Sequence, residues 1–165
     1  MVATSGDVFS IGDTEYEFSI QSISKPFVFA LVSQALSCQQ ARYKIGVNAT
    51  GLPFNSVMAI ELNESRTMNP MVNAGAIATT SLVPGATADE KWQFIHDGLS
   101  RLAGRRLTLN TEVYESEAAS NQRNQGIAHL LEGYGRMYFD PLQATDVYTK
   151  QCSLNVSVRD LAVMG

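Results

Sequence analysis

The chain has 165 residues, of which 45% are hydrophobic, and its formal net charge is −4. This length fits one domain of ordinary size, and the apolar content supplies a core and excludes a disordered chain. No run of lysine and arginine is present, so neither nucleic acid nor an anionic membrane is expected as a partner. Without a long apolar stretch or a signal-peptide pattern, the sequence predicts a cytoplasmic protein, unless a longer parent chain carries its targeting signals.

Metal and cofactor chemistry have little support in the sequence. His96 and His129 stand alone, and no cysteine pair has metal-ligand spacing, so we expect no metal site. Cys38 and Cys152 lie in apolar surroundings and are predicted to be buried thiols in a reducing compartment, with a single disulfide as the alternative. Glycine-rich phosphate-binding patterns are absent, and no cofactor is predicted.

The first half of the chain begins with a strand pattern. Tyr16, Phe18 and Ile20 alternate with polar residues, which is typical of a half-buried strand, and Gly12-Asp13 is a turn signal. We expect a β-hairpin there, followed by two helices, a loop and a helix of small apolar residues. The hairpin is expected over 8–20, the two helices over 22–37 and 39–45, the loop over 48–55, and the helix of small apolar residues over 71–82. The type of the apolar segment 56–62 stays open.

The second half is predicted to be helical. Thr87 and Glu90 form a capping-box pattern that begins a helix, and Gly104 ends it. A two-stranded hairpin by itself is only marginally stable, and the sequence supplies no other obvious strand, so we expect further strands outside these residues. The remaining helices are expected from 111 past 118, over 127–131 after an interruption at 121–124, over 140–151, and from 157.

The pattern S-x-x-K, formed by Ser22 and Lys25, stands where the strand pattern changes to a helix pattern. A serine hydroxyl needs a base within hydrogen-bond reach to act as a nucleophile. Residues three apart share one face of a helix, so Lys25 is stacked one turn from Ser22. If Ser22 opens the helix, its oxygen also lies at the positive end of the helix dipole. The pattern is typical of serine acyl-transfer enzymes.

An exposed helix start is the simpler interpretation of these residues, with Ser22 or Ser24 as the N-cap and Lys25 in water. The surroundings favour the catalytic interpretation. Pro26 is tolerated in a first helical turn, and the helix after it is too apolar for a surface position. We therefore expect Lys25 at the mouth of a buried helix, where burial lowers the pKa of its amine and makes it a usable base.

Two further polar groups stand out. Asn73 lies just inside the helix of small apolar residues, where an amide is unfavourable unless it is paired. Two interpretations of Asn73 stay open: a structural amide bonded to the backbone, and an amide that binds substrate.

Glu117 and Asn124 flank Arg123 in a helical region. A weak surface ion pair and a carboxylate that holds a substrate ammonium group are both open there.

Taken in order, these segments resemble one family, the bacterial-type glutaminases, which are serine-dependent amidohydrolases related to β-lactamases and penicillin-binding proteins. The resemblance runs across the whole chain. Four ordered segments carry it: Phe18–Lys25, which contains S-x-x-K; Asn69–Ile77, which spells NPMVNAGAI; Glu117 followed by Arg123-Asn124; and Tyr148 with QCS at 151–153 and DLA at 160–162.

The resemblance implies an α+β, predominantly helical fold of the β-lactamase and penicillin-binding-protein type, with a helical part and an incomplete antiparallel sheet. It also implies hydrolysis of L-glutamine to L-glutamate and ammonia through an acyl-serine, with Ser22 as nucleophile and Lys25 as its base. A carboxylate suits the α-ammonium group of glutamine, and amide and hydroxyl donors suit its α-carboxylate. The residues that would hold glutamine are Ser22, Asn73, Glu117, Asn124 and Tyr148, with Gln21 as a further helper.

Members of the family are nearly twice as long. The resemblance places a further catalytic tyrosine, a K-S-G-like strand and a second oxyanion donor after the last residue of this chain, and another active-site tyrosine before its first. We therefore expect residues 1–165 to form a partial glutaminase domain that is impaired or inactive by itself. The resemblance also implies a homo-oligomer.

Two other functions remain as alternatives. A penicillin-recognising acyltransferase or β-lactamase shares S-x-x-K, but it would need an S-D-N-like element that the middle of the chain lacks. A non-catalytic module that binds an amino acid would keep the pocket without complete catalytic parts.

Overall fold

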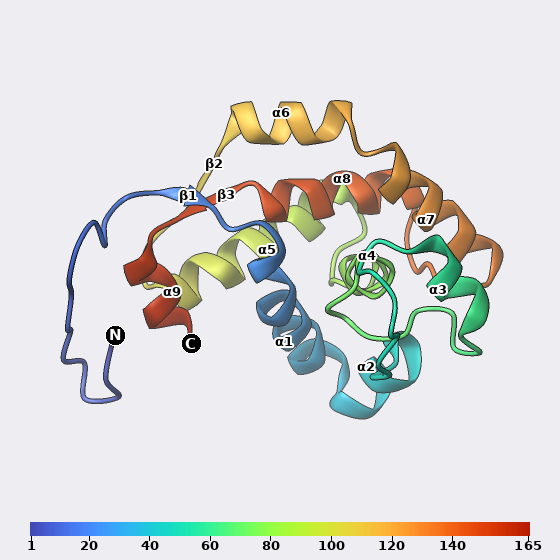
Figure 1. Cartoon of the computed structure of the whole chain (residues 1–165), viewed down its shortest axis with the longest axis horizontal. Coiled ribbons are helices and arrows are strands. Elements are labelled where there is room, and N and C mark those ends of the chain that lie inside the picture. The colour runs from blue at the N-terminus through green and yellow to red at the C-terminus, as the bar shows by residue number, and fades with distance from the viewer.

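The computed structural model describes all 165 residues and is mainly helical. Figure 1 shows the helices gathered into one body, with the first 17 residues running along its edge as an extended loop. The nine α-helices are α1 (Ser24–Leu36), α2 (Cys38–Ile45), α3 (Val57–Leu62), α4 (Asn73–Ser81), α5 (Ala88–Ala103), α6 (Thr111–Ala119), α7 (Gln122–Gly133), α8 (Pro141–Cys152) and α9 (Val158–Met164).

The sheet is small and differs from the prediction. Its three antiparallel strands, β1 (Phe18–Ser19), β2 (Thr108–Leu109) and β3 (Leu154–Val156), lie in the order β1-β3-β2. Phe18 pairs with Val156, so the expected hairpin over 8–20 is wrong, and so is the expectation that this chain supplies no further strand. Local alternation indicates a strand but not its partner, and strands of two or three residues are too short to show a period.

The helix predictions are largely confirmed, except that the expected interruption over 121–124 is limited to 120–121, because α7 already begins at Gln122. The Thr87 and Glu90 capping box is present, and Gly104 ends α5 with a φ of 70°. The segment whose type stayed open is helix α3. The expected helix over 22–37 begins as a short 3₁₀ turn, η1 (Gln21–Ile23), before α1, so Ser22 precedes the α-helix instead of opening it.

Helix α4 is the centre of the molecule, and every one of its residues is buried. In Figure 1 it is seen end-on, with α1, α3, α7 and α8 around it. Its small side chains allow this close packing: a Cβ on Gly75 would overlap the backbone carbonyl of Asn69. The same fit fixes the loop before α4 against the helix.

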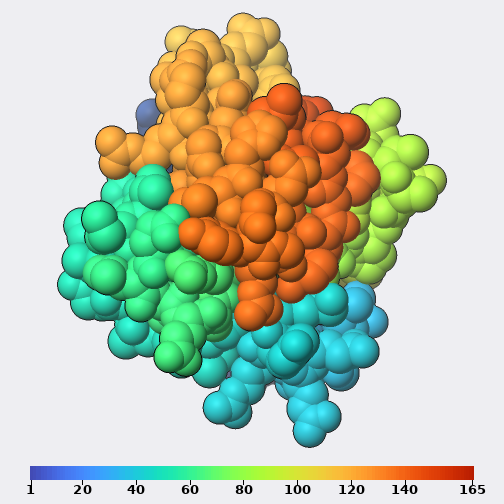
Figure 2. Space-filling model, turned by 90° about the vertical axis from the view of Figure 1, so that its right-hand side faces the viewer, coloured from blue at the N-terminus to red at the C-terminus, as the bar shows by residue number.

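Two hydrophobic clusters make up the core. One joins α3, α4, α7 and part of α8, and the other joins α1, α5, α9 and the strands. Helix α8 belongs to both, because Tyr148 contacts the first cluster and Val147 the second. Figure 2 shows α7 and the chain after it lying beside the segment that contains α3. At this contact the Tyr134 hydroxyl donates a hydrogen bond of 2.7 Å to Glu61.

Both cysteines are free. Cys152 is buried as predicted, whereas Cys38 is exposed because it begins helix α2 at the surface. No helix combines the length and the apolar character that crossing a bilayer requires.

Candidate active site

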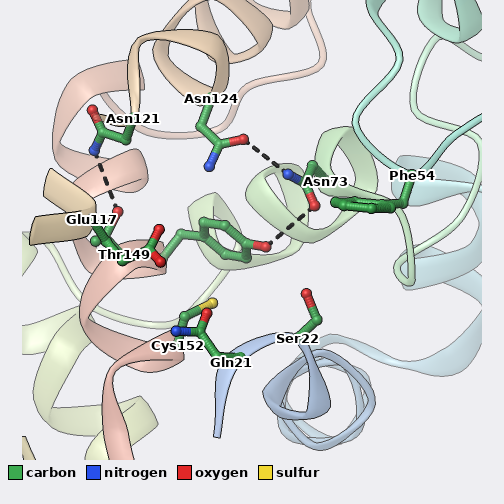
Figure 3. A pocket seen from close by; sticks show the side chains of 10 residues that line it. Gln21, Ser22, Phe54, Asn73, Glu117, Asn121, Asn124, Thr149 and Cys152 are labelled. Carbon is green, nitrogen blue, oxygen red and sulfur yellow. Dashed lines mark hydrogen bonds between the residues drawn. The ribbon is translucent and has the colours of Figure 1, made fainter. Parts of the chain in front are cut away.

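Ser22 lies in the turn between strand β1 and helix α1. Strand β1 ends at Ser19, and the Ile20 N–H donates to the Leu154 carbonyl at 2.8 Å, which fixes the chain entering the turn. Gln21 then adopts a φ of 50°, in the left-handed region that side chains other than glycine rarely occupy. Ser22 follows, exposed, and Figure 3 shows its hydroxyl pointing into the pocket.

Lys25 lies in the first turn of α1 and is only 4% exposed. Its Nζ donates to Asn73 Oδ1 at 2.9 Å and to the Met71 carbonyl at 3.2 Å, and the Phe54 ring centroid is 5.5 Å away. Burial lowers the pKa of the Lys25 amine, as the sequence predicted, and Cys152 opposes that shift to a smaller extent. A neutral amine has two N–H donors and one lone pair, so these two bonds leave the lone pair available.

Asn73 is the hub of the polar network. Its Oδ1 accepts from Lys25 and, at 3.5 Å, from the Tyr148 hydroxyl, while its Nδ2 donates to Asn124 Oδ1 at 3.0 Å. The Lys25 donor therefore fixes which way the amide points. All of these partners are side chains, so the interpretation of Asn73 as an amide bonded to the backbone is wrong for its side chain.

Tyr148 extends from α8 and is buried. Burial raises the pKa of its hydroxyl well above the usual value, and the neighbouring Cys152 raises it further. Burial also raises the pKa of the Cys152 thiol. Both groups are therefore neutral near pH 7, and Tyr148 is a hydrogen-bond donor there.

Glu117 stands on the open side of the pocket, on α6, and is exposed. Neither Glu117 nor Arg123 belongs to any of the ion pairs of the chain, so the surface ion pair considered for them does not form. Nearby, Asn121 Nδ2 donates to Thr149 Oγ1 at 3.4 Å, as the dashed line in Figure 3 shows. A carboxylate without an internal partner is free to bind a cation from solvent.

These groups enclose one cavity of about 230 Å³. Most of the predicted site residues line it, while Lys25 lies behind it and reaches it through Asn73. Four lining residues were not predicted as site residues. Asn121 and Cys152 fall within segments that the sequence marks, whereas no sequence pattern indicates a site at Phe54 or Thr149. The lining residues are Gln21, Ser22, Phe54, Asn73, Glu117, Asn121, Asn124, Tyr148, Thr149 and Cys152.

The chain brings no three histidine, cysteine or acidic side chains together as metal ligands. The pocket offers an exposed serine, a buried lysine of lowered pKa that donates directly to Asn73 of the Asn73–Asn124 amide pair, and a carboxylate without an internal partner. These are the residue types that serine-dependent acyl-transfer enzymes use, and the unpaired carboxylate suits a small ligand that carries a positive charge.

Comparison with known proteins gives the family. The family model described as Glutaminase matches residues 1–165. Glutaminase 2 of Yersinia pestis is 66% identical over the whole chain, which covers 48% of that protein. The chain therefore belongs to the glutaminase family, as the resemblance predicted, and it spans about half the length of the curated relatives it matches.

Solved structures agree with this assignment. The structure of the probable glutaminase ybaS matches with a TM-score of 0.95 at 44% identity, over 97% of this chain and 52% of that one. A Bacillus glutaminase matches with a TM-score of 0.90 at 32% identity, over 93% of this chain and 52% of that one. The predicted fold class, α+β and mainly helical in the β-lactamase-like manner, is confirmed by these neighbours.

Proposed function

We propose that this chain carries the nucleophile and the substrate-binding residues of an enzyme that hydrolyses L-glutamine to L-glutamate and ammonia. One observation carries the proposal: Ser22 and four predicted substrate-binding residues from four different helices line the same cavity. These four are Asn73, Glu117, Asn124 and Tyr148. Membership of the glutaminase family supports the choice of substrate and weighs against a penicillin-recognising enzyme.

Recognition follows from the free groups of the pocket. The α-ammonium group of glutamine is placed at the unpaired carboxylate of Glu117. The α-carboxylate is placed against neutral donors, the free Nδ2 of Asn124 and the hydroxyl of Tyr148, which exchanges its long 3.5 Å bond to Asn73 Oδ1 for the substrate. The side-chain amide then extends toward Ser22, at the opposite wall of the pocket.

Catalysis proceeds by acyl transfer. The neutral amine of Lys25 takes the proton of Ser22 Oγ, and the oxygen attacks the amide carbon of the substrate. The backbone N–H of Ser22 stabilises the developing oxyanion. The carbon–nitrogen bond breaks, the proton passes from Lys25 to the leaving nitrogen, and ammonia departs. Water then hydrolyses the acyl-serine with Lys25 again acting as the base, which releases L-glutamate.

The test is ammonia release from L-glutamine in two settings. One is the 165-residue chain, which we expect to be impaired or inactive by itself. The other is a hybrid in which this chain replaces the matching residues of the Yersinia pestis relative, called the hybrid below. We expect turnover by the hybrid, loss of turnover with Ser22→Ala, and no change with Ser10→Ala, which alters an exposed serine that does not line the pocket.

The outcomes separate the alternatives. A folded hybrid that releases no ammonia, beside an active Yersinia relative, would overturn the proposal. Calorimetric binding of L-glutamine to both forms without turnover would instead favour the non-catalytic binding module. Covalent labelling of Ser22 by penicillin, without turnover of glutamine, would favour the penicillin-recognising enzyme.

Self-association and a cytoplasmic location also remain proposals for the whole protein. Light scattering of the hybrid measures the first, and a single subunit at micromolar concentration contradicts it. Fractionation of cells that express the protein at its native level measures the second, and recovery outside the cytoplasm contradicts it.

A further inference from the structure

The turn that presents Ser22 has an unfavourable backbone conformation. Gln21 has a φ of 50°, and the residue at the N-cap of this 3₁₀ turn makes no side-chain capping bond. A residue other than glycine keeps such a conformation only where the surrounding structure fixes it. The groups that hold the turn therefore decide where the Ser22 hydroxyl points.

A chain of buried hydrogen bonds reaches the turn from the core. Ser24 Oγ donates to the Gln21 carbonyl at 2.8 Å, and this bond uses the only hydrogen of that hydroxyl. Gln151 must therefore donate to Ser24, which it does through Nε2 at 3.1 Å. At its other end, Gln151 Oε1 accepts from Thr80 Oγ1 of α4 at 3.2 Å.

Gln151 is 1% exposed, and Ser24 and Thr80 are fully buried. A buried primary amide is unfavourable unless it is paired, and Gln151 meets this condition through its bonds to Ser24 and Thr80. Gln151 does not line the pocket, whereas Tyr148, one turn earlier on the same helix, does. Of the two side chains that Gln151 contacts, Ser24 is the one that bonds the turn, whereas Thr80 lies on α4.

The segment from Gln151 to Leu154 thus holds the nucleophile turn from two sides. Leu154 binds the residue that enters the turn, through the bond from Ile20, and Gln151 binds the turn itself through Ser24. Because α8 also carries Tyr148, one rigid helix sets the nucleophile and one substrate-binding group relative to each other.

We propose that Gln151 is a positioning residue, which holds the Gln21–Ser22 turn in its left-handed conformation through Ser24 and so directs the Ser22 hydroxyl into the pocket. The catalytic part of this proposal rests on the proposed function, because it takes Ser22 as the nucleophile. The structural part, control of the turn, does not depend on it.

The kinetic test is Gln151→Leu in the hybrid. Leucine fills much of the same volume but cannot donate to Ser24, so the turn relaxes. We expect kcat to fall on the order of 10- to 100-fold, the effect of misplacing a reacting group by about 1 Å. KM should stay within about twofold, because Asn73, Glu117 and Tyr148 keep their places. A folded Gln151→Leu hybrid with unchanged kcat would overturn the proposal.

Thr145→Val is the matched control. Thr145 is fully buried on the same helix, and its hydroxyl bonds only to the Pro141 carbonyl. The substitution removes one buried hydrogen bond from α8 without touching the turn. We expect a lowered Tm with unchanged kcat, and an equal loss of kcat in this control would mean that any damage to α8 suffices.

A double-mutant cycle tests the route through Ser24. Ser24→Ala removes the link between the amide and the turn, and it is a second variant should Gln151→Leu fail to fold. We expect Ser24→Ala to lower kcat to a similar extent and the double variant to be no worse than either single one. Independent losses that multiply would show that Gln151 does not act through Ser24.

A crystal structure of the 165-residue chain with Gln151→Leu, or with Ser24→Ala, decides the structural part without any activity. We expect Gln21 to leave the left-handed region and the Ser22 hydroxyl to turn away from the pocket. If Gln21 keeps its positive φ and Ser22 its place, the proposal is wrong. An unsubstituted hybrid that releases no ammonia would instead refute the proposed function, and this structural result would still stand.

Discussion

The two ends of helix α4 each hold a buried lysine, and the two lysines have different surroundings. At the first end, Lys25 donates to Asn73 Oδ1 and to the Met71 carbonyl just before the helix. At the last end, Lys91 donates to the carbonyls of Ser81 and Val83. The two side chains are 4% and 5% exposed, so burial does not distinguish them.

The helix dipole does distinguish them. Burial lowers the pKa of both amines. The N-terminal end of α4 carries a partial positive charge that disfavours an ammonium at Lys25, whereas the C-terminal end carries a partial negative charge and two free carbonyls that favour an ammonium at Lys91. The same residue at equal burial is therefore suited to act as a base at one end of the helix and as a helix cap at the other.

The largest expected effect is the fall in kcat on replacing Lys25, and it separates the role of a base from the role of a helix cap. Lys25→Met should lower the kcat of the hybrid by about 10²- to 10⁴-fold, the usual contribution of a general base, with a small change in KM. Lys91→Met should leave kcat unchanged and lower stability by about 1–3 kcal/mol, because two buried carbonyls lose their donor. Steady-state kinetics and thermal unfolding of both variants measure this. Equal losses of kcat would show that both lysines are structural.

The sequence predicted a buried lysine beside Ser22, but it did not predict that Lys91 binds the other end of α4. The S-x-x-K spacing places Lys25 near Ser22 from local geometry alone. The partner of Lys25 is Asn73, which is 48 residues away. The sequence marks Asn73 as an amide inside an apolar helix, but nothing in it pairs this amide with Lys25. Lys91 lies in an amphipathic helix among charged residues, and nothing in the local pattern indicates that it reaches the end of α4.

The wrong hairpin and the missed pocket residue Phe54 have one physical cause, which is pairing between residues that are distant in sequence. Phe18 pairs with Val156 across the whole chain, so the period-two pattern at Tyr16–Ile20 was assigned to a local hairpin that does not form. Phe54 lines the pocket because its carbonyl accepts from the Asn73 N–H at 2.8 Å, whereas the sequence indicates only a loop there. Helices follow from local signals, and pairings distant in sequence do not.

A second prediction concerns how tightly the N-terminal end of α4 is fixed. Gly75→Ala should destabilise the 165-residue chain by about 3 kcal/mol, because the new Cβ overlaps the Asn69 backbone, which has no room to move. Gly98→Ala is the control, since its Cβ would meet only the flexible side chain of Leu31. Both changes gain the same helix propensity. We expect Tm to fall on the order of 10 °C in the first and by much less in the second.

The pH dependence tests whether the dipole argument applies to Lys25. Only the neutral amine accepts the proton of Ser22, so kcat/KM should rise about tenfold per pH unit and level off at the pKa of Lys25. Because burial lowers that pKa, the plateau should begin below pH 10.5. Lys91→Met should leave this profile unchanged. A rise that continues through pH 10.5 would mean that the Lys25 pKa is not lowered.

The same shift affects stability in a defined direction. The folded chain holds the protons of Lys25 and Lys91 less tightly than the unfolded chain does. Between the lowered pKa values and about 10.4, the unfolded state binds more protons, so these two groups make the free energy of unfolding rise with pH. Below the lowered pKa values this slope disappears. Urea unfolding of the chain and of Lys91→Met at several pH values measures its size.

The smallest effect on activity is expected at Glu117, which lies on α6 and not at either end of α4. Glu117 is exposed on α6 and has no internal partner, so Glu117→Gln removes the charge without disturbing a network. One charge-assisted hydrogen bond at an exposed site contributes about 1.5 kcal/mol, which corresponds to about a tenfold higher KM for L-glutamine, with kcat unchanged. Glu115→Gln, which alters an exposed carboxylate on the same helix that lines neither the pocket nor the hollow beside it, should change neither constant. A fall in kcat at constant KM would instead place Glu117 in the chemical step.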